Sequence, residues 1–415
     1  MSSSIFLKLF EYCLLIKLDP YIKLNDRQHG FRKNYSTATA CFVLKETVLN
    51  YTNADSRVYS CFLDISKAFD SINHNILFNK LHQMGIPHYL IDVMRFWYRN
   101  QNVRVKYRDA FSDEWKLMNG VRQGGVLSGL LFSIYINALI DRVSETNMGC
   151  MLGISRSNII AYADDIVILA PSRQALQFLL NICFTEAIAL GLEFNCQKNK
   201  IMVFHPSSRR VLTKLATHFM IGGSYIEEVE SVKYLGFIIR KDLKDDDDID
   251  RALKKFYMEF NQILRKFHFT EKSIKIFLFK QYCMQIYGAE LWFGSKSKRL
   301  LKQFEVGFHK AIKKLLGLSS HESNHYACQE ASLLMFDHFI NKLKICATIR
   351  FFKKPCRFIE KIIPYLNVSS KLLNDVLSIL ESVYDCDSLF DNDLMALTSR
   401  IHFTQNHEEQ LRTSW

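Results

Sequence analysis

Two aspartates interrupt an otherwise apolar run in the chain, Asn158-Ile-Ile-Ala-Tyr-Ala-Asp-Asp-Ile-Val-Ile-Leu169. Apolar residues on both sides of Asp164 and Asp165 predict two buried strands joined by a tight turn that carries both carboxylates. A third acid, Asp64, directly follows another apolar run at residues 58–63. Because buried strands hold their end residues rigidly, we expect a sheet that gathers three carboxylates at one edge.

Three carboxylates held close together repel one another unless cations lie between them. Mg²⁺ prefers oxygen ligands, and two such ions about 3.5–4 Å apart can hold both the attacking and the leaving oxygen of a phosphoryl transfer. Paired aspartates are also common in turns, because Asp suits turn geometry. The pair alone would more often be a solvated hairpin tip, so its interpretation depends on other parts of the chain.

Two further blocks accompany the acidic hairpin in a fixed order. They are Phe62-Leu-Asp-Ile-Ser-Lys-Ala-Phe-Asp-Ser-Ile-Asn-His74 and Asn119-Gly-Val-Arg-Gln-Gly-Gly-Val-Leu-Ser-Gly-Leu-Leu-Phe132. Together with Tyr-Ala-Asp-Asp, they make the chain resemble the reverse transcriptases of non-LTR (LINE-type) retrotransposons. Weaker matches are Gln28-His-Gly-Phe-Arg32, Gly191-Leu-Glu-Phe-Asn195 and Lys233-Tyr-Leu-Gly-Phe237, the last resembling the primer-grip hairpin. The resemblance covers about residues 5–240 well and is loose to 330.

The resemblance implies an α+β right-hand polymerase. Its parts would be partial fingers and a palm at residues 1–240, a basic helical thumb-like region at 241–330, and a C-terminal helical region of unknown role at 331–415. The palm would be an antiparallel sheet with helices covering one face. The implied reaction is RNA-directed addition of deoxynucleotides to a primer 3′-hydroxyl, with two Mg²⁺ ions or with Mn²⁺. The implied partners are an RNA template, a DNA primer and deoxynucleoside triphosphates.

The resemblance also implies roles for individual residues. Asp64, Asp164 and Asp165 would be catalytic and would bind the metal ions. Phe69 would be the steric gate that rejects a 2′-hydroxyl, although an ordinary core Phe is an alternative. Gln123 and Gly124 would contact the incoming nucleotide and the template, although a tight loop would also explain them. The remaining nucleotide-binding candidates are Tyr162, near the primer end, and the cations Lys198 and Arg32. From their own chemistry, Asp70 and Asn73 are expected to cap or orient the helix that follows rather than to bind metal.

Two departures from the family bear on activity. Gly129 stands where the family has Pro, which would fix φ at the start of the next helix. The chain also begins inside the fingers, so we expect an N-terminally truncated protein with no endonuclease segment before the polymerase. A catalytically inactive remnant that folds and binds nucleic acid is therefore an alternative. A group II intron-type reverse transcriptase is a second enzymatic interpretation, but Arg122 and the block at residues 30–32 favour the LINE-type one.

The positive charge is concentrated after the polymerase motifs. The chain has a net charge of +12, and residues 251–315 carry 15 Lys or Arg against 4 Asp or Glu, a net +11. Helices are predicted at residues 249–267 and 300–316, with basic residues beside aromatic ones. This pattern favours salt-dependent binding to a nucleic-acid backbone. The acidic run at residues 242–250 is predicted to be an exposed loop between palm and thumb.

The remaining features exclude other classes. The chain contains no run of about 18 apolar residues, so we do not expect a membrane span. Lys8 and Glu11 argue against a signal peptide and for an amphipathic N-terminal helix. Eleven cysteines without a CxxC pair predict reduced thiols and an intracellular protein, nuclear or cytoplasmic. His321, His325 and Cys328 lack a fourth ligand nearby, so we do not predict zinc. The oligomeric state stays open.

Overall fold

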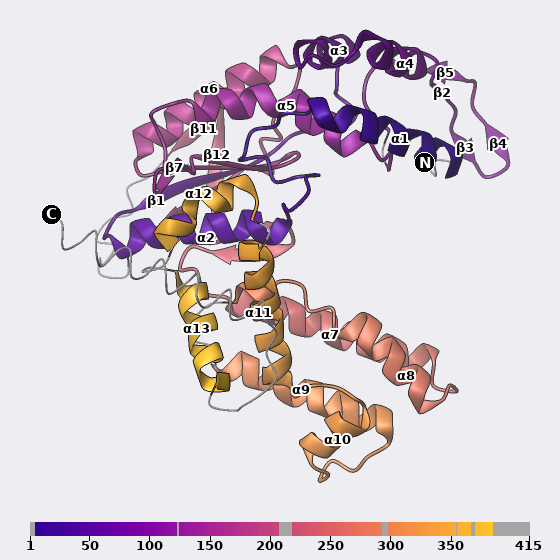
Figure 1. The fold of residues 1–415 in the computed structure, drawn as a ribbon, viewed down its shortest axis with the longest axis vertical. Helices are drawn as coiled ribbons and strands as arrows, with labels where there is room; N and C mark the ends of the chain where they lie inside the picture. Colours follow the sequence, from indigo (N-terminus) through magenta and orange to yellow (C-terminus); the bar gives the residue numbers. More distant parts are fainter. Residues whose placement is uncertain are drawn as a thin grey trace. The chain divides into compact units, whose positions relative to one another are not determined.

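The chain divides into two compact units (Figure 1). The computed structural model describes residues 5–122, 124–206, 218–292, 298–353, 355–366 and 370–384. The first unit runs to residue 229 and includes residues 356–358, and the second contains the rest of the chain. The predicted C-terminal tail after residue 384 lies outside the described residues.

The first unit is built around a six-stranded sheet in the order β11-β12-β10-β1-β9-β8. Its strands are β1 (Val58–Asp64), β8 (Ile159–Tyr162), β9 (Asp165–Ala170), β10 (Lys200–Phe204), β11 (Phe219–Ile221) and β12 (Ser224–Glu228). All neighbours are antiparallel except the parallel pair of β10 and β12. The predicted α+β fold with an antiparallel palm sheet is confirmed, and the structure adds this one parallel pair.

The first unit also contains helices and short two-stranded segments. They are α1 (Ile5–Leu18), η1 (Asp19–Tyr21), α2 (Thr37–Asn53), α3 (His74–Gln83), α4 (His88–Arg99), α5 (Ser128–Ser144) and α6 (Arg173–Ala189), with β2 (Asn102–Val103), β3 (Lys106–Tyr107), β4 (Ala110–Phe111), β5 (Trp115–Lys116), β6 (Met151–Leu152) and β7 (Ser155–Arg156). The helix expected to start near Gly129 is α5. The predicted N-terminal helix is confirmed as α1, but not its amphipathic pattern, because Ile5 and Phe6 are exposed while Glu11 is buried.

The central strands are apolar without alternation because helices cover both faces of the sheet. Cys61 and Leu63 on one face of β1 belong to the core that α5 and α6 share. Phe62 points to the other face and is also buried, and helix α2 packs against β1 and β8 (Figure 1). The prediction of helices on one face was therefore incomplete. Burial on both faces makes the strand ends rigid, which matters for the acids that they carry.

The second unit contains one β-hairpin and helices. Its elements are β13 (Ser231–Tyr234), β14 (Phe237–Arg240), α7 (Asp246–Lys266), α8 (Lys272–Leu278), the π-helix η2 (Phe279–Cys283), η3 (Ala289–Leu291), α9 (Lys298–Leu316), α10 (Asn324–Glu330), α11 (Phe336–Lys353), α12 (Arg357–Leu366), which begins in the first unit, and α13 (Lys371–Tyr384). The two predicted basic helices are confirmed as α7 and α9. Aromatic side chains at helical spacing form their core, for example Phe256 and Phe260 of α7 with Phe304 and Phe308 of α9.

Only residues 242–245 of the acidic run form a loop, so the prediction of an exposed loop over residues 242–250 was wrong for most of its length. From Asp246 onward the run forms the first turns of α7, where the helix dipole favours negative charge. Asp248 is only 3% exposed. Its carboxylate accepts hydrogen bonds from the backbone N–H of Ile238 (3.0 Å), Arg251 Nε (2.8 Å) and Trp292 Nε1 (2.9 Å). One carboxylate thus joins strand β14, helix α7 and the segment after η3.

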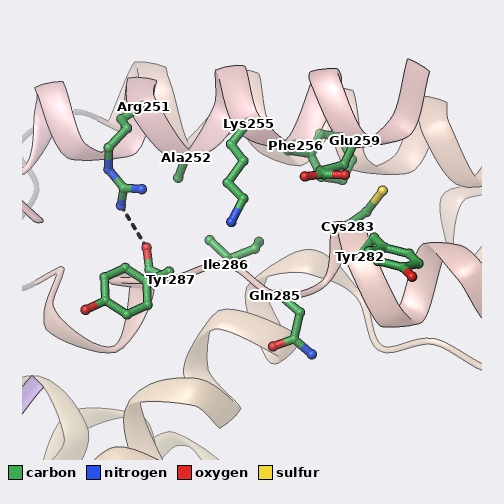
Figure 2. A pocket seen from close by; sticks show the side chains of 10 residues that line it. All are labelled: Arg251, Ala252, Lys255, Phe256, Glu259, Tyr282, Cys283, Gln285, Ile286 and Tyr287. Atoms are coloured by element: carbon green, nitrogen blue, oxygen red, sulfur yellow. Dashed lines mark hydrogen bonds between the residues drawn. The ribbon is translucent and has the colours of Figure 1, made fainter. Parts of the chain in front are cut away.

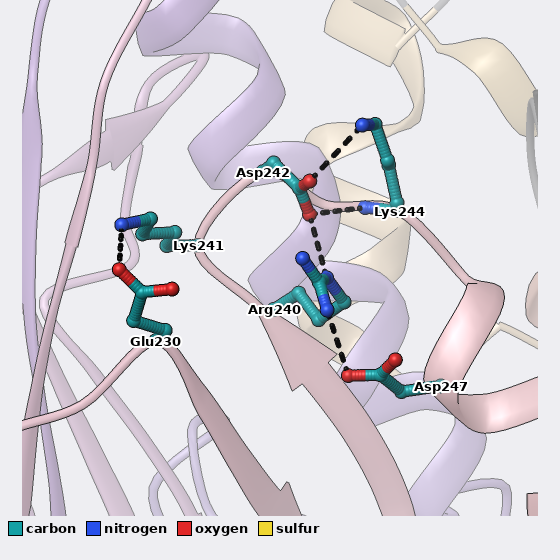
Figure 3. Close-up of polar contacts among 6 residues, drawn as sticks. All are labelled: Glu230, Arg240, Lys241, Asp242, Lys244 and Asp247. Carbon is teal, nitrogen blue, oxygen red and sulfur yellow. Dashed lines mark hydrogen bonds and ion pairs between the residues drawn. The ribbon is translucent and has the colours of Figure 1, made fainter.

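A second group of ion pairs joins the hairpin to the same helix (Figure 3). Arg240 at the end of β14 binds Asp242 through Nε (3.1 Å) and Asp247 through Nη1 (2.9 Å). Lys241 pairs with Glu230 across the open end of the hairpin. Charges that looked like a hydrated linker in the sequence therefore fasten β14 to the start of α7.

A small cavity lies between α7 and residues 282–287 (Figure 2). Arg251 Nη2 donates to the carbonyl of Tyr287 at its edge (2.8 Å). The cavity volume is about 10 Å³, which is about the space that one water molecule needs. The cavity is therefore too small for a nucleotide.

Candidate active site

The three predicted acids come together at one end of the central strands. Asp64 ends β1 and is the direct cross-strand partner of Asp165, the first residue of β9. Asp165 is also paired with Tyr162 of β8, and residues 163 and 164 form the turn between these two strands. Directly opposed residues in antiparallel strands have Cα atoms about 4.5–5.5 Å apart. The backbone thus brings acids that are 100 positions apart in sequence to one edge of the sheet.

A cleft of about 440 Å³ opens beside these acids. This volume falls within the range of about 300–1,000 Å³ that is typical of ligand pockets. Its lining contains four of the candidate residues from three separate motifs: Asp64, Phe69, Asp164 and Lys198. The other lining residues are Ile65, Ser66, Lys67, Ala68, Asp70 and Asn195. The tertiary structure therefore unites motifs that the sequence could only place in order.

The electrostatics of the acids favour a cation between them. Partial burial, with a smaller contribution from Asp64, raises the pKa of Asp164. Asp165 is exposed at the start of β9, but desolvation by the surrounding atoms and the neighbouring Asp164 and Asp64 raise its pKa to about 6. Lys198 Nζ lies 3.2 Å from Asp64 Oδ2 and lowers the pKa of both other acids only in part. Repulsion among the carboxylates remains, and a divalent ion would relieve it.

The carboxylates do not form a closed metal cage. Among the described residues, no three His, Cys, Asp or Glu side chains are gathered closely enough to hold a metal ion alone. Mg²⁺ usually binds through one or two carboxylates together with substrate phosphates rather than in an all-protein cage. An open set of oxygen ligands beside a cleft fits that kind of binding.

Phe69 lies in the loop that follows Asp64 and faces the cleft. Its ring is 5.2 Å from the ring of Phe132 in α5, and its carbonyl accepts a hydrogen bond from Val121 N (2.8 Å). Asn73 caps α3, as predicted, because its side chain accepts from the backbone N–H of residues 75 and 76. The half-buried Phe69 is thus held from behind and presents one side to the cleft.

The glycine-rich loop before α5 is fixed by a residue that sequence reasoning missed. Glu11 of α1 is 2% exposed, and its carboxylate accepts from the backbone N–H of Val126 and Leu127. These are orphan donors at the start of a helix. Gly124 has φ of +83° and an open Cβ position, and Gln123 lies outside the described residues. The only sign of this role in the sequence was that Glu11, an acid, stands within a largely apolar N-terminal segment.

Gly129 has a structural explanation. A Cβ atom at this position would lie 2.4 Å from the ring of Phe31. Phe31 itself has φ of +55° and lies beside Tyr162, with ring centroids 6.3 Å apart. The ring of Phe31 therefore occupies the space that a larger residue at position 129 would need, which accounts for the departure from the family's Pro.

Arg32 does not line the cleft. Its Nη1 donates to the carbonyls of Asn25 (2.6 Å) and Gln28 (3.1 Å), and its guanidinium stacks on the ring of Tyr35 at 4.1 Å. These contacts favour a structural role in the loop before α2. Tyr162 is half-buried at the end of β8, where partial burial raises its pKa.

The first unit has an α+β fold whose sheet carries acids at the turn of a hairpin and at the end of the adjoining strand, beside an open cleft. This arrangement defines the palm of a template-directed polymerase. The chain belongs to the reverse transcriptase family: residues 3–239, more than half of the chain, match the family described as "Reverse transcriptase (RNA-dependent DNA polymerase)". The resemblance predicted from the motifs is confirmed. Among the described helices, none combines the length and the apolar character needed to cross a bilayer.

Individual relatives come from retrotransposable elements. The chain is 28% identical over 241 residues to the Pol polyprotein of element R2 from Nasonia vitripennis, which covers 57% of this chain and 23% of the relative. It is 29% identical over 240 residues to that of R2DM from Drosophila melanogaster, covering 56% and 22%. The chain thus spans less than a quarter of the length of these relatives. A solved structure of apo telomerase from Candida tropicalis aligns with a TM-score of 0.45 and 13% identity, covering 91% of this chain and 60% of that one.

Proposed function

We propose that the cleft beside Asp64 and Asp164 catalyses RNA-directed DNA synthesis, with deoxynucleotides added to a primer 3′-hydroxyl. The observation that carries this proposal is the cross-strand pairing of Asp64 with Asp165 next to the turn that holds Asp164. The cleft beside them also contains Phe69 and Lys198. Family membership supports the same activity.

Asp64, Asp164 and Asp165 would hold two Mg²⁺ ions, or Mn²⁺ in their place. The bound ions would supply positive charge for the attacking hydroxyl and the leaving pyrophosphate. The protein's own part is to place the carboxylates, and the raised pKa values of Asp164 and Asp165 support their need for a cation. Positioning and charge neutralisation account for most of the catalysis in phosphoryl transfer.

The other cleft residues would select and hold the nucleotide. Phe69 would lie under the sugar and exclude a 2′-hydroxyl. The position of its ring in the lining of the cleft supports this role. Lys198 would neutralise phosphate charge once its ammonium group has moved away from Asp64. Gly124, Gln123 and Tyr162 would contact the nucleotide, the template and the primer end. For Arg32 we propose support of the loop before α2, because its guanidinium already binds two backbone carbonyls.

The second unit would hold the template–primer duplex. Along α7 and α9, lysines such as Lys254, Lys255, Lys302 and Lys310 are exposed while the aromatic residues face the core. Helix α9 carries six Lys or Arg against one Glu, whereas α7 carries five residues of each sign. A concentration of positive charge such as that on α9 binds phosphates without reading sequence. We therefore propose that residues 1–240 are fingers and palm and that residues 241–330 act as the thumb. We propose no role for residues 331–415.

The test is primer extension by the full chain on an RNA template with a DNA primer. Asp164→Ala should abolish extension, by at least about 10³-fold, which is the scale of loss when an essential charge-stabilising group is removed. Asp92→Ala is the matched control, because Asp92 is exposed on α4 and pairs with Arg95 at the surface (3.6 Å). Folded wild-type protein that binds RNA in a salt-sensitive way without extending a primer would contradict the proposal.

A further inference from the structure

The turn that carries Asp164 has an unfavourable backbone conformation. Only two residues, 163 and 164, connect the paired ends of β8 and β9. Ala163, the first of them, has φ of +55°. Asp164 is not among the residues with positive φ, and two-residue turns with positive φ at the first position alone (type II′) normally contain Gly there. Because Ala is disfavoured in that region, neighbouring groups must hold the turn.

A segment from another part of the chain lies along the outer side of β8. Gln28 and Ala161 form a parallel bridge. Ala161 N donates to the carbonyl of Arg27 (2.9 Å), and His29 N donates to the carbonyl of Ala161 (2.7 Å). Residues 27–29 thus extend the palm sheet by a short edge strand next to the hairpin.

The side chain of Gln28 reaches from this edge strand to the turn. Its Oε1 accepts hydrogen bonds from Ala163 N (3.1 Å) and from Gly30 N (2.9 Å). Only the amide oxygen can accept from two N–H donors, so these contacts fix the orientation of the amide. Gln28 is fully buried, which prevents its rotation away from the turn.

The position of Gly30 shows how closely the two segments approach. A Cβ atom on Gly30 would lie 2.6 Å from Ala163 N and 3.2 Å from Gln28 Oε1. Any other residue at position 30 would therefore push the turn away from the amide. Gly30 gives the Gln28 oxygen access to both N–H groups.

The amide is poorly suited to a purely structural position. Among the described residues, its Nε2 is buried without a hydrogen-bond partner. A buried donor without a partner destabilises the fold, and an apolar side chain of the same shape would avoid that penalty. The contact that Gln28 makes and an apolar residue could not make is the one with the turn.

We propose that Gln28 is a positioning residue for the metal-binding aspartates, and that it acts by holding the Ala163 N–H and thereby the turn that carries Asp164. This inference rests on the function proposed above. A group that orients a metal ligand from behind changes metal affinity or activity about 10- to 100-fold when it is removed. The effect of Gln28 is therefore specific to the metal requirement and not only to stability.

The test compares two glutamine variants of the full chain. Gln28→Met keeps the length of the side chain and removes the acceptor. Gln177→Met is the matched control, because Gln177 in α6 also binds a backbone N–H of the palm sheet, that of Met220 (3.0 Å). Met220 lies in β11, at the edge of the sheet opposite β8. Gln28→Glu is the conservative variant, since a carboxyl oxygen can still accept both N–H bonds.

Two readouts are measured for each variant: the Mg²⁺ concentration for half-maximal primer extension, and Mn²⁺ binding to the protein alone by water-proton relaxation. Gln28→Met should raise both the Mg²⁺ requirement and the Mn²⁺ dissociation constant about 10- to 100-fold. Gln177→Met should change them less than about twofold, and Gln28→Glu should recover most of the loss. Equal effects of Gln28→Met and Gln177→Met, or no effect of Gln28→Met, would overturn the inference.

The outcomes separate this inference from the proposed function. If wild-type protein binds Mn²⁺ but extends no primer, the proposed function fails, and the Mn²⁺ titration still decides the role of Gln28. If Gln28→Met does not fold, amide hydrogen exchange of the wild-type protein decides. The Ala163 N–H should then exchange as slowly as the paired amides of β9, and exchange at the rate of an open turn would refute the inference.

Discussion

Lys198 Nζ lies 3.2 Å from the carboxylate of Asp64, although the two residues are 134 positions apart. Backbone contacts enforce this proximity. Asn195 N donates to the carbonyl of Asp64 (2.8 Å), and Asp64 N donates to Asn199 Oδ1 (3.0 Å). The turn before β10 is thus tied to the end of β1, and the lysine in that turn occupies the place beside Asp64 that a metal ion would need.

Lys198→Met should therefore tighten metal binding in the absence of nucleotide. A unit charge about 4 Å from a carboxylate contributes about 1 kcal/mol in water, which corresponds to about a fivefold change in affinity. We expect the Mn²⁺ dissociation constant to fall about two- to fivefold, because the lysine is exposed and its effect is screened. Lys200→Met is the control, since Lys200 pairs with Glu227 on the neighbouring strand β12. Weaker Mn²⁺ binding in Lys198→Met would contradict the expectation.

Phe69→Ala should admit ribonucleotides. The ring is supported by Phe132 and borders the cleft next to Asp64, so its removal opens space on the sugar side. We expect the ratio of kcat/KM for deoxynucleotides over ribonucleotides to fall at least about tenfold. Phe69→Tyr keeps the aromatic plane and should keep the discrimination. Unchanged sugar selectivity in Phe69→Ala would refute the gate assignment.

Asp248→Ala should destabilise the second unit strongly. Its buried carboxylate binds three donors, and its loss leaves the Arg251 guanidinium and the Trp292 N–H without this acceptor. Removing one partner of a buried charged pair costs about 3–5 kcal/mol in the free energy of unfolding. Asp250→Ala, which removes a surface pair with Lys254, should cost about 0.5 kcal/mol or less. Urea unfolding followed by circular dichroism measures both, and similar losses in the two variants would disprove the buried role.

His29 should make the first unit sensitive to acid. Complete burial, with a smaller effect of Arg32, lowers the pKa of His29 to about 3, whereas an unfolded chain has an ordinary His pKa near 6.5. Above pH 6.5 the imidazole of His29 is neutral in both the folded and the unfolded protein. Between about pH 6.5 and 3 the unfolded state takes up a proton that the folded state does not, so stability is lost as the pH falls, by about 1.4 kcal/mol per pH unit.

The variant His29→Gln checks this pH dependence. Gln carries no titratable group. Between pH 6 and 4, the free energy of unfolding of the variant should therefore fall less steeply than that of the wild type, by about 1.4 kcal/mol per pH unit, which corresponds to one proton. His88→Gln is a control, because His88 is partly exposed at the start of α4. An identical slope in wild type and His29→Gln would show that His29 is protonated in the folded protein.

The local sequence was sufficient to predict features that depend on a single helix or strand. The apolar runs at residues 58–63 and 158–169 predicted buried strands with acids at their ends, and the structure has β1, β8 and β9 there. Helices are also predicted at residues 249–267 and 300–316, where the structure has α7 and α9. Strand and helix patterns are local, because the same side chains that define them also form the buried face.

The sequence failed where partners come from distant segments. The acids at residues 242–250 looked hydrated, yet Asp248 is buried because Ile238, Arg251 and Trp292 supply its hydrogen bonds. Glu11 looked like a surface charge on a helix and instead caps α5. Gly129 looked like a loosened helix start, and the ring of Phe31 explains it. In each case the chemistry of the residue was visible in the sequence, but the group that satisfies it was not.

The order and chemistry of its motifs determined by themselves which family this protein belongs to and which acids end its buried strands. Only the tertiary structure decided that Asp64 lies opposite Asp165, that Lys198 stands beside them, and that Gln28 holds the turn of Asp164. Hydrogen bonds and close packing between segments more than 100 residues apart depend on register and on space in the folded chain, and no local pattern of side chains encodes either one.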